Sequence, residues 1–294
     1  MPFIAMGSIC CIVIASFLGL CVGQVRQDVP LDQQLFFSTV RIHSSNESSS
    51  TSGSGFIFQH NSNNYIVTCR HVLSSATIST FFFTESINDA PRLFSGDKER
   101  RECSAVLSNL QSVVLYHPDS LVDVAIISLK YVLQSHLVRC SNKGGKPYFI
   151  PIPDSLIPTE NEAKLLNFIQ PILFIGYPTG LFDVRTNLPL ARHGFTASPY
   201  ILDWHDKSQF IIDASVFPGS SGSPVFVLEQ GSYYAGNTMT VGKTRILFLG
   251  MLSAAYIPPI VVNQTTFINL GIAAKPKLIL ETLSFRNGNK KDEL

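Results

Sequence analysis

The sequence predicts an all-β fold of two packed six-stranded antiparallel β-barrels with a short C-terminal helix. The 294-residue chain is 45% hydrophobic and contains 21 Phe, which is typical of a sizeable core built from strands. About a dozen apolar runs of strand length alternate with turn residues. A less regular stretch with Pro and Lys, residues 136–168, separates these runs into two groups, as a linker between two barrels would.

The N-terminal lobe, residues 24–135, contains the first group of predicted strands. They are residues 35–43, 55–60, 65–73, 77–84, 112–118 and 122–129. The polar residues 24–34 predict an arm, and the Ser- and Gly-rich residues 44–55 predict a mobile loop.

The C-terminal lobe, residues 169–286, contains the second group. Its predicted strands are residues 171–178, 192–198, 209–217, 223–229, 245–257 and 266–274. Residues 276–285 begin with Pro and carry apolar residues at helical spacing, which predicts a short helix. Residues 287–294 form a tail.

Both ends of the chain carry targeting signals. Residues 1–23 contain no charged side chain and predict a signal peptide cleaved after Gly23, although an uncleaved signal anchor is the alternative. The last four residues, Lys291 to Leu294, read KDEL, the address for retrieval to the endoplasmic reticulum. No other apolar run is long enough to span a bilayer. We therefore expect a soluble lumenal protein, without stable membrane insertion after signal cleavage, that binds a KDEL-type retrieval receptor.

The cysteines and glycosylation acceptors fit this compartment. Outside the predicted signal the chain keeps Cys69, Cys103 and Cys140. This odd number leaves at least one thiol unpaired or linked to a partner, and the sequence leaves the pairing open. Asn46 in "NES" and Asn263 in "NQT" are N-glycosylation acceptors.

Charge and spacing exclude several classes of function. The formal net charge is +1 and no basic block stands out, so no nucleic acid partner is expected. The cysteine spacings match no zinc pattern. We expect neither a metal nor a cofactor.

The stretch "DASVFPGSSGSPVFV", residues 213–227, has the composition of a rigid, sharply turned loop between strands. A plain Gly/Pro/Ser turn is one interpretation, and a nucleophile loop is the other. None of the seven histidines follows Ser221, which excludes the chain order of α/β-hydrolases. A base that activates Ser221 must therefore precede it.

His71 and Asp123 are the best-placed partners for such a serine. His71 ends the apolar run "YIVTCRHV", and Asp123 stands at the head of the apolar run "DVAIISL". A buried aspartate is costly without a partner, and a histidine Nδ1–H is one such partner. A structural hydrogen bond for His71 and a turn cap for Asp123 are the alternatives.

These pieces together resemble trypsin-like serine peptidases of the chymotrypsin fold, most of all the HtrA/Deg-type branch. The motifs are "GSGFIF" with "YIVTCRHVL", then "DVAIISL", "LFIGYPTGL" with "RHGFTAS", "DASVFPGSSGSPVF" and "INLGIAAKPKLILETL". The resemblance runs from about residue 36 to 284 and keeps the order of that family. It implies His71 as general base, Asp123 as its orienting partner and Ser221 as nucleophile. It also implies an oxyanion hole from the backbone N–H groups of Gly219 and Ser221.

The chain departs from the family at two points. Ser220 stands where trypsin zymogens have an aspartate that captures a new amino terminus, so we expect no activation of that kind. The branch usually carries a PDZ domain after the peptidase, but only about ten residues follow the predicted helix.

Four residues are expected to line the primary specificity pocket by the same resemblance. They are Ser215, Ser253, Ala254 and Ala255. None is acidic, which argues against cleavage after Arg or Lys and favours a small or medium apolar residue.

The sequence thus predicts a serine-type endopeptidase acting on polypeptide substrates in the endoplasmic reticulum. A non-catalytic binding module, or holdase, on the same fold is the alternative. A cysteine hydrolase that uses Cys69, Cys103 or Cys140 with His193 or His205 has no local sequence context in its favour.

Overall fold

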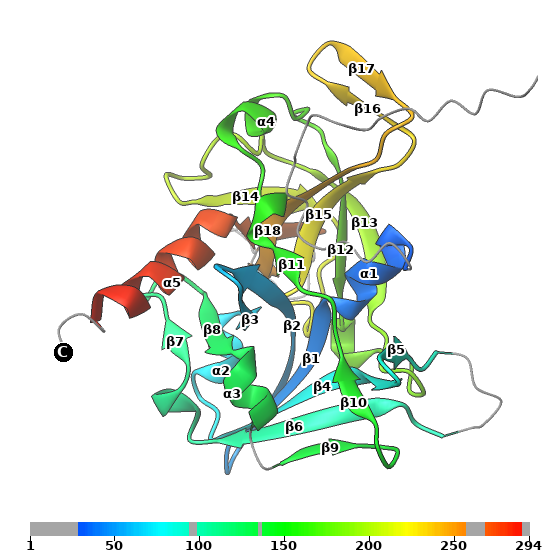
Figure 1. Cartoon of the computed structure of the whole chain (residues 1–294). Coiled ribbons are helices and arrows are strands. Elements are labelled where there is room, and N and C mark those ends of the chain that lie inside the picture. Colours follow the sequence, from blue (N-terminus) through cyan, green and yellow to red (C-terminus); the bar gives the residue numbers. More distant parts are fainter. Residues whose placement is uncertain (1–28, 94–98, 135–136, 257–267, 290–294) are drawn as a thin grey trace, which may run out of the picture.

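A computed structural model describes residues 29–93, 99–134, 137–256 and 268–289 (Figure 1). The predicted signal peptide, the KDEL tail and Asn263 lie outside these residues. Within them the chain is mostly β-strand, arranged in two lobes.

The first lobe is a twisted, mainly antiparallel sheet around an apolar interior. Its main path runs β7-β8-β3-β2-β1-β4-β6-β9. The strands of this path are β1 (Thr39–Ser45), β2 (Ser50–His60), β3 (Asn63–Thr68), β4 (Ile78–Ile87), β6 (Glu102–Ser108), β7 (Leu115–Tyr116), β8 (Ala125–Ser128) and β9 (Val138–Cys140).

Three further short strands join this sheet, which makes it eleven-stranded. β5 (Ala90–Pro91) and β10 (Lys146–Tyr148) pair with β4, and β11 (Ile152–Pro153) pairs with β2. The strand path does not show this sheet closed into the expected six-stranded barrel in the described ranges. The long strands β2 and β4 extend beyond the ends of the strands beside them. The short strands β5, β10 and β11 pair with the backbone N–H and C=O groups of these extensions.

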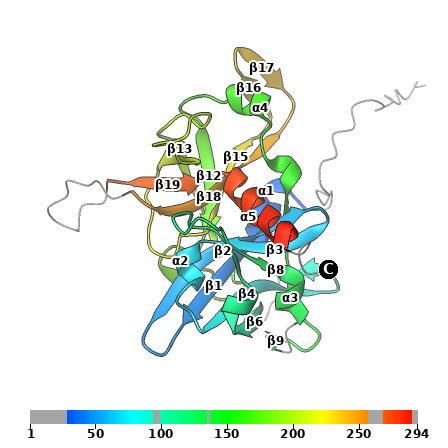
Figure 2. The same cartoon turned by 90° about the vertical axis from the view of Figure 1, so that its left-hand side faces the viewer.

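The second lobe confirms the expectation of a six-stranded barrel. It closes in the order β12-β13-β14-β19-β18-β15. Its strands are β12 (Pro171–Gly176), β13 (Leu190–Thr196), β14 (Gln209–Asp213), β15 (Pro224–Glu229), β18 (Arg245–Ala255) and β19 (Leu270–Ala274). The hairpin of β16 (Ser232–Ala235) and β17 (Thr238–Val241) projects from this lobe (Figures 1 and 2).

Helices are few and short. They are α1 (Leu31–Phe37), α2 (Arg70–Leu73), α3 (Leu129–Gln134), α4 (Glu160–Lys164) and α5 (Pro276–Asn289), with 3-10 turns η1 (Leu110–Ser112), η2 (Asp154–Leu156) and η3 (Pro178–Gly180). α5 confirms the predicted C-terminal helix, and it contacts β7 and β8 of one lobe and β18 of the other (Figure 2). In the described ranges no helix is both long and apolar enough to cross a bilayer.

The described part of the expected arm, residues 29–34, and the expected mobile loop, residues 44–55, contribute to regular elements. The arm ends in α1, which includes the start of the expected strand at residue 35. Most of residues 44–55 lies in the paired strands β1 and β2. Asn46 makes the turn between them, because its Oδ1 accepts hydrogen bonds from the N–H groups of Ser48 and Ser49 at 2.9 and 2.8 Å.

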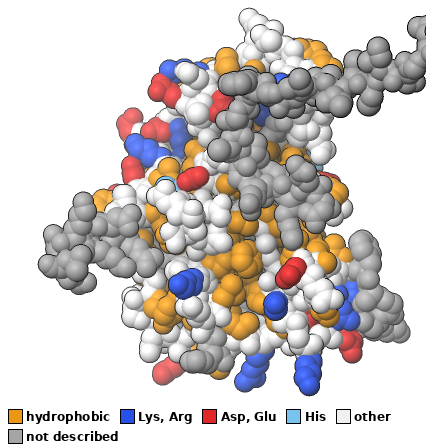
Figure 3. Space-filling model, in the orientation of Figure 1, with side chains coloured by type: hydrophobic (Ala, Val, Ile, Leu, Met, Phe, Trp, Pro, Cys, Tyr) orange, Lys and Arg blue, Asp and Glu red, His pale blue; other side chains and the backbone are white. Residues whose placement is uncertain are grey.

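Residues 136–168, predicted as a linker, contribute β9, β10 and β11 to the first sheet. Cys140 of β9 forms a disulfide with Cys103 of β6. In the orientation of Figure 1, hydrophobic side chains gather on the face of the molecule around β10 (Figure 3). A shallow groove between α1 and β11 is lined mainly by apolar residues, among them Leu35, Ile152 and Leu156.

One hydrophobic cluster extends across the two lobes, and the second barrel has a core of its own. The ring of Phe248 in β18 packs on Phe56 and Phe58 of β2 and on Phe226 of β15, with centroids 5.2, 5.9 and 5.8 Å apart. All four rings are fully buried. Burial of each such ring stabilises the folded state by about 1.5–3 kcal/mol. This packing fixes the position of the first lobe relative to the second, and the candidate site lies where they meet.

Candidate active site

His71 lies in α2, the one-turn helix that follows β3, and not in the strand itself as expected. Asp123 lies just before β8. Since β3 and β8 pair antiparallel with Thr68 opposite Ala125, the end of one strand and the start of the other bring the two residues together.

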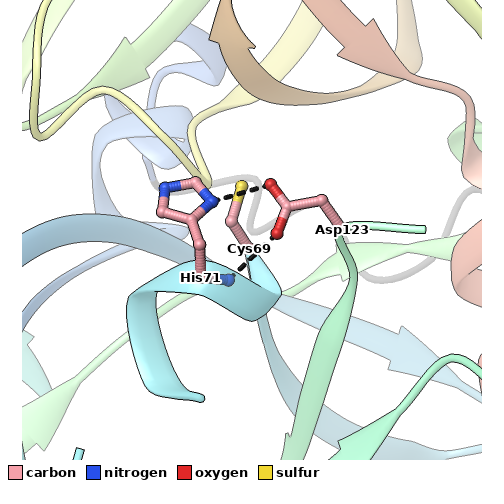
Figure 4. A group of neighbouring side chains, drawn as sticks. All are labelled: Cys69, His71 and Asp123. Carbon is pink, nitrogen blue, oxygen red and sulfur yellow. Dashed lines mark hydrogen bonds and ion pairs between the residues drawn. The ribbon is translucent and has the colours of Figure 1, made fainter. Parts of the chain in front are cut away.

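Two hydrogen bonds join His71 to Asp123 (Figure 4). The backbone N–H of His71 donates to Asp123 Oδ1 at 3.0 Å, and Nδ1 lies 2.8 Å from Oδ2. An ionised carboxylate only accepts, so Nδ1 carries the proton of the neutral imidazole and Nε2 keeps its lone pair. His71 therefore holds the tautomer that a general base needs.

Asp123 is held in its ionised form. Burial pushes the pKa of this carboxyl upward, but the hydrogen bonds and charge of His71 outweigh burial and leave the pKa below its ordinary value. A third contact comes from the other lobe, since Ser253 Oγ donates to Asp123 Oδ2 at 3.3 Å. Sequence reasoning assigned Ser253 only to a pocket wall and missed this bond. β18 has an irregular register between Leu252 and Ala254, and such a bulge re-aims the residue within it.

Cys69 lies beside this pair (Figure 4). Its Sγ, an imidazole nitrogen of His71 and a carboxylate oxygen of Asp123 all lie within 4.8 Å of one another. A metal ion needs a thiolate here, but burial, with the nearby Asp123, raises the pKa of the Cys69 thiol well above its ordinary value. The imidazole and the carboxylate already satisfy each other, so these residues fit a hydrogen-bonded cluster better than a metal site.

The same facts argue against a cysteine nucleophile. Cys103 and Cys140 are joined in a disulfide, and the free Cys69 is fully buried. A cysteine hydrolase needs an accessible thiolate, which none of these three residues provides.

The serine loop is a tight turn between β14 and β15. Ser220 N–H donates to Phe217 C=O at 3.0 Å, and the C=O of Pro218 accepts from Thr179 N–H at 2.5 Å. In a planar trans peptide the C=O and the following N–H point in opposite directions, so the Gly219 N–H points away from Thr179. Gly219 has φ +87° and an added Cβ would lie 2.5 Å from Tyr177 O, so this position requires glycine.

The N–H groups of Gly219 and Ser221 donate to no acceptor in the part of the chain that the structure describes. Ser54 of β2 holds the two residues in place. Its N–H donates to Ser221 O at 2.8 Å and its Oγ donates to Gly219 O at 2.8 Å. Its Oγ also accepts from Tyr177 N–H at 2.9 Å. Ser54 is fully buried and was not singled out from the sequence.

A backbone hydrogen bond next to Ser221 links the serine turn to the strand that contacts Asp123. Gly222 N–H donates to Leu252 O at 2.7 Å, and the next residue, Ser253, contacts Asp123. No hydrogen bond joins the Ser221 hydroxyl to His71 within the described ranges. The remaining predicted pocket residues are partly buried, and they are Ser215, which precedes the turn, and Ala254 and Ala255, which end β18.

A two-lobed β fold with a paired histidine and aspartate in one lobe and a glycine-bordered serine turn in the other is typical of serine peptidases. The family model of the trypsin-like peptidase domain matches residues 53–235, more than half of the chain, so the chain belongs to this family. The predicted resemblance to trypsin-like serine peptidases is confirmed. Among curated proteins there is no significant match.

Solved structures of serine proteases are similar in fold. A thermostable serine protease AL20 from an extremophilic microorganism has 16% identity and a TM-score of 0.46, over 85% of this chain and 97% of that chain. The serine endoprotease from Yersinia pestis has 16% identity and a TM-score of 0.46, over 87% and 65%. The HtrA-type protease AlgW with tripeptide has 15% identity and a TM-score of 0.49, over 86% and 60%. This chain thus spans at most 65% of the last two.

Proposed function

We propose that this protein is a serine endopeptidase that hydrolyses peptide bonds through an acyl-enzyme. Ser221 Oγ attacks the carbonyl carbon, His71 Nε2 takes the hydroxyl proton, and Asp123 orients the ring and stabilises the imidazolium. The observation that carries the proposal is the 2.8 Å contact of His71 Nδ1 with Asp123. It directs Nε2, with its lone pair, away from the carboxylate and leaves it available as a base.

The turn of Gly219 and Ser221 supports the second half of the mechanism. The attack places negative charge on the carbonyl oxygen, and the two free N–H groups are the donors that would stabilise it. Each donor of this kind contributes about 3 kcal/mol in the transition state. The imidazolium of His71 then protonates the leaving amine, and a water molecule activated by the same imidazole hydrolyses the acyl-enzyme.

The missing hydrogen bond between Ser221 and His71 is compatible with this proposal. In enzymes without substrate, catalytic hydrogen bonds are often long and tighten only in the substrate complex. Ser221 directly precedes Gly222, and the N–H of Gly222 is hydrogen-bonded to β18, the strand that contains Ser253. This bond holds the backbone next to Ser221 near the strand that contacts Asp123.

We also propose that the enzyme acts in the lumen of the endoplasmic reticulum. The apolar residues 1–23 and the terminal KDEL support this location. The Cys103–Cys140 disulfide is of the kind that forms in oxidising compartments. Asn46 donates from Nδ2 to Ser75 O, and a glycan on Nδ2 would leave one hydrogen for this bond. The proposed partners are polypeptide substrates and a KDEL-type retrieval receptor.

The test is covalent labelling of the folded protein with a fluorophosphonate probe, together with digestion of a peptide library. We expect labelling and cleavage in the unmodified protein and in Ser232→Ala, an exposed serine of the projecting hairpin. Both are expected to be lost in Ser221→Ala. Absence of labelling in the folded, unmodified protein contradicts the proposal and favours the non-catalytic binding module.

A further inference from the structure

Arg192 of β13 is unusual among the arginines of this protein. Partly or fully buried arginines elsewhere in the described ranges have a carboxylate or a carbonyl partner. These pairs are Arg41–Glu102, Arg92–Glu85, Arg245–Glu229, Arg70–His117 O and Arg101–Leu93 O. The partly buried Arg192 has neither, and its Nη1 is a buried nitrogen without a hydrogen-bond partner.

The surroundings of Arg192 place its charge beside the serine turn. Its guanidinium carbon lies 5.1 Å from the ring centroid of Phe217 and 5.5 Å from that of Phe174. Phe174 faces Arg192 across the β12–β13 pair and belongs to the barrel core. Phe217 begins the turn, because its C=O accepts from Ser220 N–H, and the residue is 41% exposed. The guanidinium therefore lies near two aromatic rings, and one of them, Phe217, begins the loop that carries Ser221.

The partly buried guanidinium of Arg192 has lost part of its hydration, and no anion of the described residues compensates for that loss. Contacts with aromatic faces compensate only partly for lost water. Burying a guanidinium N–H without an acceptor is unfavourable. A planar guanidinium forms its strongest hydrogen bonds with carboxylates, and these bonds gain strength where water is excluded. Within the described ranges the fold supplies no anion for this guanidinium, so its charge is left for a carboxylate of a bound molecule.

We propose that Arg192 forms a subsite that binds a carboxylate of the polypeptide substrate next to the scissile bond. This proposal rests on the proposed function, because it assigns the ligand to the substrate of Ser221. The carboxylate belongs to an acidic side chain or to the free C-terminus of a short substrate, and the two sources share the same chemistry. Arg192 is not one of the four residues expected to line the primary pocket, so an acidic preference here adds to the apolar preference of that pocket.

Binding to an inactive variant tests the proposal independently of catalysis. In full-length Ser221→Ala, calorimetry compares peptides that differ only by Glu or Gln at each successive position, each with a free or an amidated C-terminus. We expect one position at which Glu binds about tenfold or more tightly than Gln, as for one charge-assisted hydrogen bond shielded from water. A preference for the free acid over the amide instead identifies the C-terminus as the source.

Two further variants separate the role of the charge from that of the fold. In Arg192→Gln, combined with Ser221→Ala, the preference should fall to about one, whereas Arg139→Gln, an exposed arginine of β9, should leave it unchanged. Arg192→Lys should retain a reduced preference, because an ammonium keeps the charge without the planar fork. Equal binding of all matched peptides, or a preference that survives in Arg192→Gln, overturns the proposal.

The proposed function fails by a different result. In the protein with Ser221 intact, absence of fluorophosphonate labelling would contradict the proposed peptidase activity. The calorimetry of Ser221→Ala would still decide whether Arg192 binds a carboxylate. Conversely, if the protein is labelled and cleaves the Glu and Gln peptides equally well, the peptidase proposal stands and the acidic subsite is contradicted.

Discussion

Replacement of Ser54 by alanine is the sharpest test of how the first lobe positions the serine turn of the second. The substitution removes the hydroxyl that donates to Gly219 O at 2.8 Å and accepts from Tyr177 N–H at 2.9 Å. The Ser54 N–H keeps its bond to Ser221 O. Ser54→Ala therefore releases Gly219 and Tyr177 while leaving the backbone of Ser221 attached.

The expected loss follows from the burial of this hydroxyl. Ser54 is fully buried, so both former partners stay without water, and each unmade buried hydrogen bond costs about 1–3 kcal/mol. If the bond to Gly219 O is what holds the Gly219–Ser220 peptide, and with it the turn that presents the two free N–H groups, kcat falls by about 5- to 150-fold. KM should change little, because the oxyanion contact is made mainly in the transition state.

The assay is steady-state cleavage of a peptide found in the library digest, combined with thermal unfolding. Ser52→Ala is the matched control, since Ser52 lies two residues earlier in β2 and is exposed. We expect the control to keep the kcat of the unmodified protein. A Ser54→Ala variant that stays folded and keeps kcat within about twofold would refute the reasoning, because the turn would then hold its shape without the hydroxyl.

Three more predictions concern the groups around the pair. Ser253→Ala removes one 3.3 Å hydrogen bond to Asp123 and should lower kcat by about 2- to 10-fold without abolishing fluorophosphonate labelling; complete loss of labelling would contradict this. Because the pKa of Asp123 is depressed below its ordinary 3.8, its stabilising contribution is complete above that value and disappears as pH falls through the folded-state pKa. The stability difference between the unmodified protein and Asp123→Asn should thus shrink as the pH falls below about 4, and a difference that grows in that range would contradict this sign. Cys103→Ser together with Cys140→Ser opens a link between residues 37 positions apart and should reduce the free energy of unfolding by about 3–4 kcal/mol, measured by urea denaturation; an unchanged midpoint would speak against the disulfide in solution.

The strands could be predicted because each is a short apolar run bounded by turn residues in the sequence. The second barrel could be predicted from the number and grouping of these runs. The sequence also pointed to His71 and Asp123 as partners, since a carboxylate at the head of an apolar strand requires one, and the structure places Nδ1 and Oδ2 2.8 Å apart. The one-turn helix around His71 was not predictable, because "RHVL" continues the apolar run of β3 without a break.

Long-range contacts account for what sequence reasoning missed. Ser54 lies in a stretch of Ser and Gly that has the composition of a mobile loop, and only the approach of the second lobe gives its hydroxyl two partners. The contact of Ser253 with Asp123 depends on an irregularity in the β18 register, which no periodicity reports. Arg192 occupies a strand position where an arginine is ordinarily solvated, and its isolation appears only when Phe174 and Phe217 are placed around it.

The site is therefore a property of the junction between the lobes and not of either lobe alone. His71 and Asp123 belong to the first lobe, whereas Ser221 and Arg192 belong to the second. Ser54 crosses from the first lobe to the serine turn, and Ser253 crosses from the second lobe to Asp123. Each contact would be lost if the lobes separated by a few ångströms, since a hydrogen bond weakens steeply with distance. The fully buried Phe248, which packs on rings from both lobes, resists that separation, so the apolar core and the catalytic geometry depend on the same packing.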